Sequence, residues 1–436
     1  MQAIFSGRAP QCSGWTAGGA TATVDSASVN KYQSLLNQVK AFVGEPSDFL
    51  MGTAGTMMFD VVAAAHLFPE YFWIGNSYGH FMSNGWGEAS GNVPLTGDLG
   101  GVFGSINDPD QRALRRGYKL SAQSGAAWNA LDILHIGESI AGSRYVKDGG
   151  GNYPGGHAFE HPWAGKTIPD TTAAYSWLKS PRYNIGGTVS GTQISGGTWN
   201  VMEVGPLARQ VVNGTYWAGI LTAIYPLLAP VLFWGAPGPD CSTGGAGWGQ
   251  ALQPVYASLG PPCTGGPDLS GVAHTGDSVL DRIAARATET RILIDEAQKV
   301  LNDLNGTIGG DGYGPSGCTD RFGENVPVSS TIYRGYGMSE ASRGALSHWI
   351  AVKDGKTMLY QAVVPTTWNA SPRDVNGNPG PAEWAIQQNQ TWIADANQPI
   401  ELPRITHSFD FCIACAVHLV TPKGDVVTVD VPALPG

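Results

Sequence analysis

Near its end the chain carries FDFCIACAVH, residues 409–418, with two cysteines three positions apart and a histidine three positions after the second. Cysteine thiolates suit soft or borderline metals such as nickel, zinc and iron, which take about four ligands at such sites. The other cysteines, at positions 12, 241, 263 and 318, form no second pair at comparable spacing. The motif therefore predicts half of a metal site, and whatever the chain folds into must leave room for the other half.

Three other interpretations of the motif compete with a metal site of this kind. Half of a structural zinc site would need a second ligand pair. A redox dithiol of the thioredoxin kind normally opens a helix in a βαβ context, whereas this pair lies near a chain end. A disulfide is the third, and Cys241 and Cys263 could also form one in an oxidising compartment or stay buried thiols. Spacing alone leaves these alternatives open.

Composition narrows the class of partner. Net charge is −10, and the longest basic run is the pair at 115–116, so we expect no nucleic-acid partner. Charged residues make up only 14% of a 436-residue chain, which is long enough for a large core. The 60 glycines and 29 prolines predict long irregular connections, of the kind that large enzymes build around buried cofactors.

Two segments bear on export and membranes. The first residues, MQAIFSGRAPQC, lack a charged region followed by an apolar run, so they predict no secretory signal. The uncharged stretch 215–238 is long enough to span a bilayer. Pro226 and Pro230 argue against a straight helix there, and we favour a buried or docking segment over a membrane span.

Hydrophobic periodicity predicts more helix than strand. Helical spacing of apolar residues covers 29–43, 120–141 and 278–304, the last capped by Asp277 or Ser278. Alternation predicts two hairpins, 348–364 and 419–431, with turns at Asp354-Gly355 and near Lys423-Gly424. No internal repeat or βαβ rhythm is visible. We therefore predict a mainly α fold, a helical bundle with small peripheral β-hairpins and long Gly/Pro-rich loops.

Several segments together resemble one enzyme family. FDFCIACAVH resembles Asp-Pro-Cys-x-x-Cys-x-x-His, the C-terminal signature of the large, catalytic subunit of [NiFe] hydrogenases. EASRGALSHWI, 340–350, is similar to the family's Glu-Ala-Pro-Arg-Gly segment, and YQAVVPTTWNASPRD, 360–374, to its companion. Four more segments resemble family segments in family order: ESIAGSRY (138–145), HPWAGKTIP (161–169), AYSWLKSPRY (174–183) and MEVGPLAR (202–209). The large quinone-reducing subunit of respiratory complex I shares the general fold but lacks the two metal cysteines.

The resemblance implies a single large-subunit domain over residues 1–436, with a variable insertion at about 211–275 and a tail, 419–436, removed when nickel is inserted. The family's first cysteine pair precedes the segment that AIFSGRAP resembles. The resemblance therefore implies a split large subunit, in which an N-terminal polypeptide brings the missing Cys-x-x-Cys. An inactive remnant and a truncated chain are the alternatives.

By resemblance, Cys412 is a terminal nickel ligand and Cys415 bridges nickel to an iron that carries one CO and two cyanides. These small ligands need an apolar wall and hydrogen-bond donors. The wall would come from Leu346, Val364 and Pro365, and the donors would be Arg343 and Thr366. The sequence departs from the family at Ser342 and Phe411, where prolines are usual; Ser342 could donate a hydrogen bond to a cyanide.

The resemblance also implies roles in heterolytic cleavage of H2. Arg343 matches a guanidinium above the open metal position, and Asp410 matches the carboxylate that orients it, a strong pair in a dry pocket. The alternative for Arg343 is a structural ion pair. Cys412 is one candidate for the base. His418 and the carbonyl of Ala362 would bind Mg²⁺ or Fe²⁺, while His157 and His161 are interpreted as structural.

Electrons released from H2 need a partner, because this chain has no cysteine set for iron–sulfur clusters. We expect an iron–sulfur small subunit and a membrane electron acceptor. CIACAVH resembles membrane-associated uptake hydrogenases, which implies a periplasmic or membrane-associated site reached by co-export with a signal-bearing partner; a cytoplasmic location stays open. The predicted function is H2 oxidation, and the second hypothesis is a non-catalytic structural or assembly relative.

Overall fold

The structure, a computed structural model, describes residues 4, 15–16, 19–20, 25–44, 55–57, 60–61, 71, 74–86, 114–122, 125–164, 167–172, 177–214, 276–307, 330–388, 399–412, 419–420 and 426–427. Within these ranges no helix is long and apolar enough to cross a membrane. The apolar stretch 215–238, most of the insertion, and Cys12, Cys241, Cys263 and Cys318 lie outside the described residues.

The prediction of a mainly α fold is wrong. The described chain is 34% helical and 27% strand, in several small sheets, so it is an α/β fold. Most of the strands that the sequence analysis missed have only two to six residues, such as β7 (Thr188–Ser190) with β8 (Gln193–Ser195). Such short strands carry too few alternations for a period to emerge.

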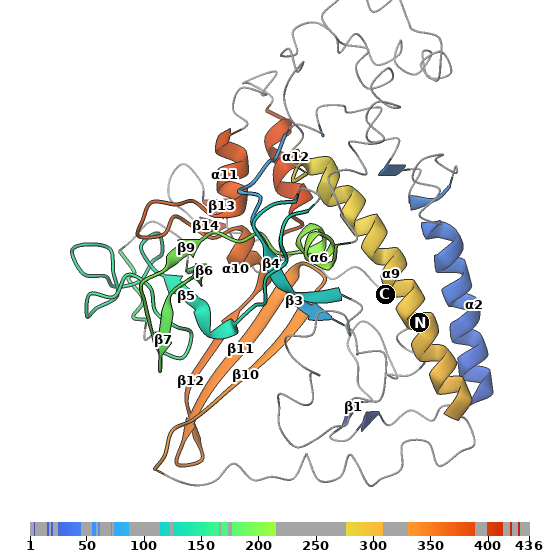
Figure 1. Cartoon of the computed structure of the whole chain (residues 1–436), viewed down its shortest axis with the longest axis horizontal. Helices are drawn as coiled ribbons and strands as arrows, with labels where there is room; N and C mark the ends of the chain where they lie inside the picture. The colour runs from blue at the N-terminus through green and yellow to red at the C-terminus, as the bar shows by residue number, and fades with distance from the viewer. Residues whose placement is uncertain are drawn as a thin grey trace, which may run out of the picture.

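An antiparallel sheet of three long strands extends from the middle of the molecule toward the lower left of Figure 1. Its strands are β10 (Tyr333–Ala341), β11 (Gly344–Lys353) and β12 (Lys356–Val363). The hairpin predicted for 348–364 is confirmed, and its turn residues Asp354 and Gly355 both have positive φ, 51° and 69°. The sequence analysis missed β10, which pairs with β11 along its whole length. Trp349 of β11 is fully buried with Trp368 in the core on one face of this sheet.

Two long helices lie side by side along one edge of the molecule (Figure 1). Helix α2 (Ser26–Val43) and helix α9 (Val279–Thr307) confirm the helices predicted for 29–43 and 278–304. Asp25 caps α2 through the amide of Ser28. Ser278 and Asp281 bond each other reciprocally at the start of α9, which is a capping box.

The helix predicted for 120–141 is wrong. Instead, β4 (Leu114–Lys119) is followed by irregular chain, a 3₁₀ turn η3 (Ile133–His135) and β5 (Ile136–Ser139). Strand β5 pairs with β6 (Ser180–Ile185), and a Cβ at Gly137 would lie 2.4 Å from the Trp199 ring. Pairing with a distant strand therefore overrides the local helical pattern, while its apolar residues still reach the core.

The remaining elements surround the sheet. Strand β3 (Phe81–Trp86) pairs with β4, and β9 (Thr198–Asn200) pairs with β6. Short helices follow later in the chain: α6 (Pro206–Asn213), α10 (Pro365–Asn369), α11 (Pro381–Gln388) and α12 (Glu401–Ser408). Near the ends, β1 (Trp15–Thr16) pairs with β2 (Gly19–Ala20), and β13 (Leu419–Val420) with β14 (Val426–Val427). The pairing predicted for the C-terminal hairpin is confirmed, and its turn lies outside the described residues.

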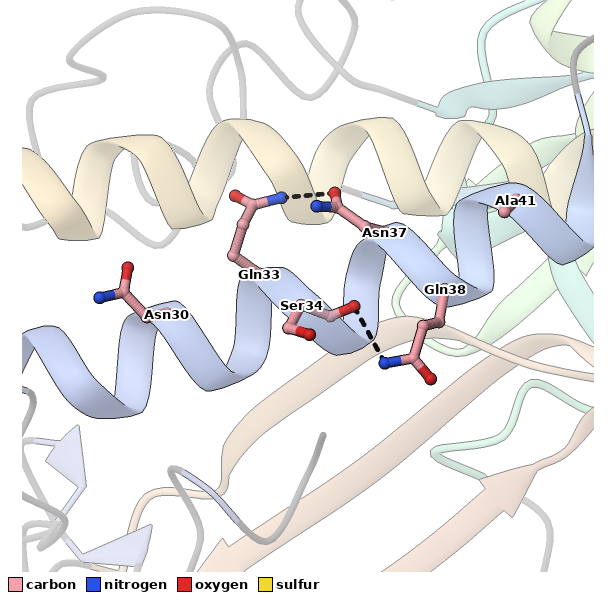
Figure 2. Close-up of a pocket in the computed structure, with 6 residues that line it drawn as sticks. All are labelled: Asn30, Gln33, Ser34, Asn37, Gln38 and Ala41. Carbon is pink, nitrogen blue, oxygen red and sulfur yellow. Dashed lines mark hydrogen bonds between the residues drawn. The ribbon is translucent and has the colours of Figure 1, made fainter.

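A shallow hollow lies on the outer side of α2 (Figure 2). Its lining residues are small or carry carboxamides, and none of them is ionisable: Asn30, Gln33, Ser34, Asn37, Gln38 and Ala41. Gln33 also reaches across to Gln298 of α9, with donor and acceptor 2.7 Å apart. The hollow therefore belongs to the pairing of the two helices and contains no predicted site residue.

Candidate metal centre

Cys412 lies just beyond α12, and its backbone is fixed by α10. The N–H of Cys412 donates a hydrogen bond to Oγ1 of Thr366 at 3.1 Å. Thr366 is buried in the first turn of α10, which begins at Pro365, with Val364 as its N-cap. Three residues predicted for one site thus lie at one helix start, directly beside the predicted nickel ligand.

The predicted partners Arg343 and Asp410 also meet. Nη2 of Arg343 lies 3.4 Å from Oδ1 of Asp410, although 67 positions separate them. The side chains are 36% and 44% exposed, so the dry pocket expected for this pair is not formed by the described chain. In this half-exposed state we expect the pair to stabilise the fold by less than about 1 kcal/mol.

Asp410 has an unusual backbone conformation. It has φ of 54°, and its N–H donates to the carbonyl of His407 at 3.0 Å, which ends α12. Glycine is the usual residue at such a left-handed helix end, and aspartate is tolerated there at some cost. The conformation turns the chain sharply, so that Asp410 and Cys412 leave the helix toward α10 and Arg343.

Close backbone contact places Arg343. Gly344 has φ of 136°, and a Cβ there would lie 2.7 Å from both Gly205 N and Val204 Cγ2. Gly205 in turn approaches the carbonyl oxygen of Arg343, 3.1 Å from where its own Cβ would be. Only two glycines allow the chain before α6 to lie this close to the turn between β10 and β11. The two family-like segments MEVGPLAR (202–209) and EASRG (340–344) are therefore in direct contact.

The buried side chain of Arg209 also holds the turn between β10 and β11. Arg209 of α6 binds Glu289 of α9 through two hydrogen bonds of 2.6 and 2.7 Å and Glu340 through one of 2.6 Å. It also donates to the carbonyls of Ala341 and Ser342 at 2.9 and 3.0 Å. Burial opposes the charge of Arg209, but the two carboxylates outweigh this effect and raise its pKa. Ser342 itself is exposed, and its backbone is fixed.

The other predicted site residues lie around this junction or outside the described chain. Leu346 is half-buried on β11, and its carbonyl accepts from Nδ2 of Asn84 at 2.9 Å. Ala362 lies on β12, opposite His348. Cys415 and His418 lie outside the described residues. His161 is buried against Trp349, consistent with its interpretation as structural.

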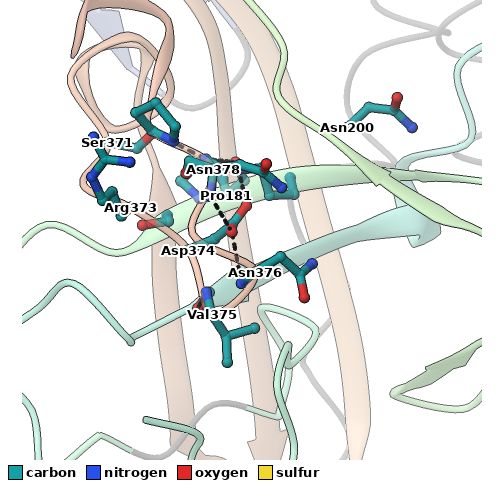
Figure 3. Close-up of polar contacts among 12 residues, drawn as sticks. Pro181, Asn200, Ser371, Arg373, Asp374, Val375, Asn376 and Asn378 are labelled. Carbon is teal, nitrogen blue, oxygen red and sulfur yellow. Dashed lines mark hydrogen bonds and ion pairs between the residues drawn. The ribbon is translucent and has the colours of Figure 1, made fainter. Parts of the chain in front are cut away.

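The loop that follows α10 is held in place by the side chain of Asp374. Asp374 accepts backbone hydrogen bonds from Asn376 and Asn378, as Figure 3 shows, at 2.9 and 3.0 Å. Its second oxygen accepts from Nε of Arg182 at 2.8 Å, and both side chains are fully buried. Two segments that sequence analysis placed in separate motifs, AYSWLKSPRY and YQAVVPTTWNASPRD, are therefore joined by the Arg182–Asp374 ion pair.

Sequence analysis missed a buried ionisable cluster beside Ala362. Glu138 is fully buried, with Nζ of Lys179 at 3.6 Å and Nε2 of Gln361 at 3.0 and 3.1 Å from its two oxygens. Burial raises the pKa of Glu138, and Lys179 acts in the opposite direction. Glu138 and Lys179 each lie inside a segment that resembles the hydrogenase family. This resemblance was the one feature of the sequence that could have pointed to the cluster.

A profile of one protein family, the nickel-dependent hydrogenases, matches residues 1–219 and 269–418. The chain belongs to this hydrogenase family. The match leaves out residues 220–268, within the region where the resemblance was weakest.

Known hydrogenase subunits are similar along most of the chain. The Hydrogenase-2 large chain of Escherichia coli is 30% identical over 443 residues, covering 98% of this chain and 64% of that subunit. The Hydrogenase-1 large chain of the same organism is 28% identical and 63% covered. The uptake hydrogenase large subunit of Rhizobium leguminosarum is 30% identical and 52% covered. This hydrogenase chain thus spans less than two thirds of the length of these relatives.

Solved hydrogenases share the fold. The reduced Ni-Fe-Se hydrogenase of Desulfomicrobium baculatum superposes with a TM-score of 0.57 at 22% identity, over 95% of this chain and 66% of that one. The Ni-Fe-Se hydrogenase of D. vulgaris Hildenborough gives 0.56 at 23% identity. These similarities show that the chain has the hydrogenase fold.

The described residues fit part of a nickel–iron site. Among them no three histidine, cysteine or carboxylate side chains gather into a metal site, and of the two predicted cysteine ligands the described residues include Cys412. Nε of Arg343 is buried and has no hydrogen-bond acceptor among the described residues. Arg343 pairs with Asp410, two residues before Cys412, and its unsatisfied buried donor suits a group that presents acceptor atoms at this place.

Proposed function

We propose that this chain supplies the nickel-binding part of a hydrogenase catalytic centre that oxidises H2. The observation that carries the proposal is the convergence of Cys412, Thr366, Arg343 and Asp410 from three separate segments in a chain of this family. The name of the similar uptake hydrogenase large subunit of Rhizobium leguminosarum supports the direction of the reaction.

In this proposal Cys412 and Cys415 would hold the nickel–iron centre through their sulfur atoms, with Cys412 on the nickel. Leu346, Val364 and Pro365 form the apolar wall for the iron's CO, and Arg343, Thr366 and Ser342 donate hydrogen bonds to its cyanides. When bound, the nickel–iron centre supplies the change of oxidation state that H2 cleavage requires. The Cys412 sulfur holds the released proton, and Arg343, oriented by Asp410, presents a fixed positive charge to the reacting atoms.

The pair Cys412 and Cys415 offers two sulfur ligands, whereas a soft metal takes about four. We propose a separate N-terminal polypeptide with its own Cys-x-x-Cys, supported by the presence of one such pair here, at Cys412 and Cys415. Electrons then leave through an iron–sulfur small subunit toward a membrane acceptor, with the complex facing the periplasm. Co-purification with a tagged form of this chain tests the set of partners.

A second ion and a processing step complete the proposal. His418 and the carbonyl of Ala362 bind Mg²⁺ or Fe²⁺, and the neighbouring Gln361, fixed on Glu138, orients that carbonyl. Residues 419–436 are removed after His418 when nickel is inserted. The intact mass of the active chain tests the cleavage, since a full-length active chain would refute it.

Metal analysis of the purified complex tests the central claim. We expect roughly one nickel and one iron per chain, lost in Cys412→Ala and Cys415→Ala and retained in the control Cys241→Ala. H2-dependent dye reduction should follow the nickel content. A complex that assembles without nickel and iron would instead identify a structural or assembly relative.

A further inference from the structure

Helix α12 ends at Ser408, two residues before Asp410, and Cys412 follows two residues after Asp410, so the end of this helix determines where the predicted ligand lies. Two arginines of α9, Arg282 and Arg286, contact this end. We propose that Arg286, supported by Arg282, is a positioning residue that holds the helix end and so places Cys412 for metal binding. The inference rests on the proposed function only for the identity of the metal.

Arg286 caps the helix with charge. Its Nη2 donates to the carbonyl of Ser408 at 2.6 Å, in the last turn of α12. Carbonyls in the last turn have no partner within the helix, and positive charge is favoured there by the helix dipole. Burial lowers the pKa of Arg286, and the Asp410 carboxylate acts in the opposite direction, so the guanidinium senses Asp410 as well.

Arg282 provides the rigid support. One helical turn before Arg286, it binds Glu203 through two hydrogen bonds of 2.8 Å and donates to the carbonyl of Gly75 at 2.8 Å. Its guanidinium lies 3.8 Å from the centre of the Phe409 ring. Such stacking of a buried guanidinium on an aromatic face fixes the ring as well as the charge.

Residues 409–412, which follow the end of α12 held by Arg282 and Arg286, are themselves fixed by several contacts. The Phe409 and Phe411 rings stack with centroids 5.9 Å apart and planes 10° apart. Asp410 between them is in the left-handed conformation, and the N–H of Cys412 is bound to Thr366. The segment 409–412 is thus held by α9 at one end and by α10 at the other. Loss of the α9 end would remove the contacts that hold the start of this segment, while the Cys412–Thr366 hydrogen bond and the half-exposed Arg343–Asp410 pair would stay.

The experiment compares Arg286→Met and Arg286→Lys with Arg291→Met in the purified complex. Arg291 is a matched control, since it is also buried on α9 but donates to the carbonyl of Gly44. Hydrogen exchange measured by mass spectrometry on peptides covering 401–412 should accelerate about tenfold in Arg286→Met, as loss of one charge-assisted bond predicts. Nickel content should fall with it, Arg286→Lys should restore part of both, and Arg291→Met should change neither.

Unchanged exchange and nickel content in Arg286→Met would overturn the inference, and so would equal changes in Arg291→Met. Should Arg286→Met fail to assemble, Arg286→Lys carries the same comparison, because it keeps the charge without the planar fork. A wild-type complex without nickel would refute the proposed function alone. The exchange comparison would still decide whether Arg286 holds the end of α12.

Discussion

The hydroxyl oxygen of Thr366 accepts a hydrogen bond from the backbone N–H of Cys412 at 3.1 Å, across 46 positions of sequence. Thr366 is buried, so its hydroxyl is held in one place. The oxygen is occupied by this bond, and the hydroxyl proton stays available to a ligand of the neighbouring metal. One side chain can therefore both place the thiolate and donate to the proposed iron ligand.

Thr366→Val tests that double role while keeping the shape of the side chain. We expect a loss of about 1 kcal/mol of stability from the missing hydrogen bond and a fall in nickel content and H2 oxidation. Thr366→Ser keeps the hydroxyl and should retain most of both. Equal metal content in the valine and serine variants would contradict the role.

Arg343→Lys and Asp410→Asn separate function from stability. The pair is half-exposed and 3.4 Å apart, so its loss should lower stability by less than about 1 kcal/mol. A group that stabilises charge at the reacting atoms is worth far more, so H2 oxidation should fall roughly 100-fold. Arg373→Lys is the control, because Arg373 forms a comparably exposed pair with Glu383. Melting temperatures and H2-dependent dye reduction measure the two effects.

Gly344→Ala should displace Arg343 by forcing apart two backbones. The added Cβ would lie 2.7 Å from Gly205 N at a φ of 136°, so both strain and collision oppose it. We expect a loss of roughly 3 kcal/mol and a strong loss of activity. Gly186→Ala adds a Cβ at φ of 78° with nothing within 4 Å, and therefore isolates the conformational strain. Urea unfolding midpoints of both variants measure the difference.

His161 should make the protein sensitive to acid. Burial lowers the pKa of His161 to about 4, from 6.5, and its Nδ1 accepts a hydrogen bond from the N–H of Trp163. The unfolded chain binds a proton in this interval and the folded chain does not, so stability falls as pH drops from 6.5 toward 4, by about 3 kcal/mol. His161→Asn keeps the acceptor and should flatten this dependence in urea titrations, while the exposed His157→Asn should follow wild type.

Local sequence patterns correctly predicted the elements whose interacting residues lie within a few positions of one another. The caps and stripes of α2 and α9 and the Asp354-Gly355 turn are determined by residues within a few positions, and all three predictions hold. The segment 120–141 failed because β5 pairs with β6, more than forty residues later. Helical spacing of apolar residues there reflects burial in a shared core and not a helix.

The sequence by itself determined the family, the two closely spaced cysteines at 412 and 415, and the residues proposed to surround them, because these follow from residue type and spacing. Only the tertiary structure decided that Gly205 touches the Arg343 backbone, that Arg209 holds the turn at Ser342, and that α9 holds the end of α12. These contacts join segments about 120 to 140 residues apart. Long-range packing and buried charge determine them, and a linear pattern contains neither.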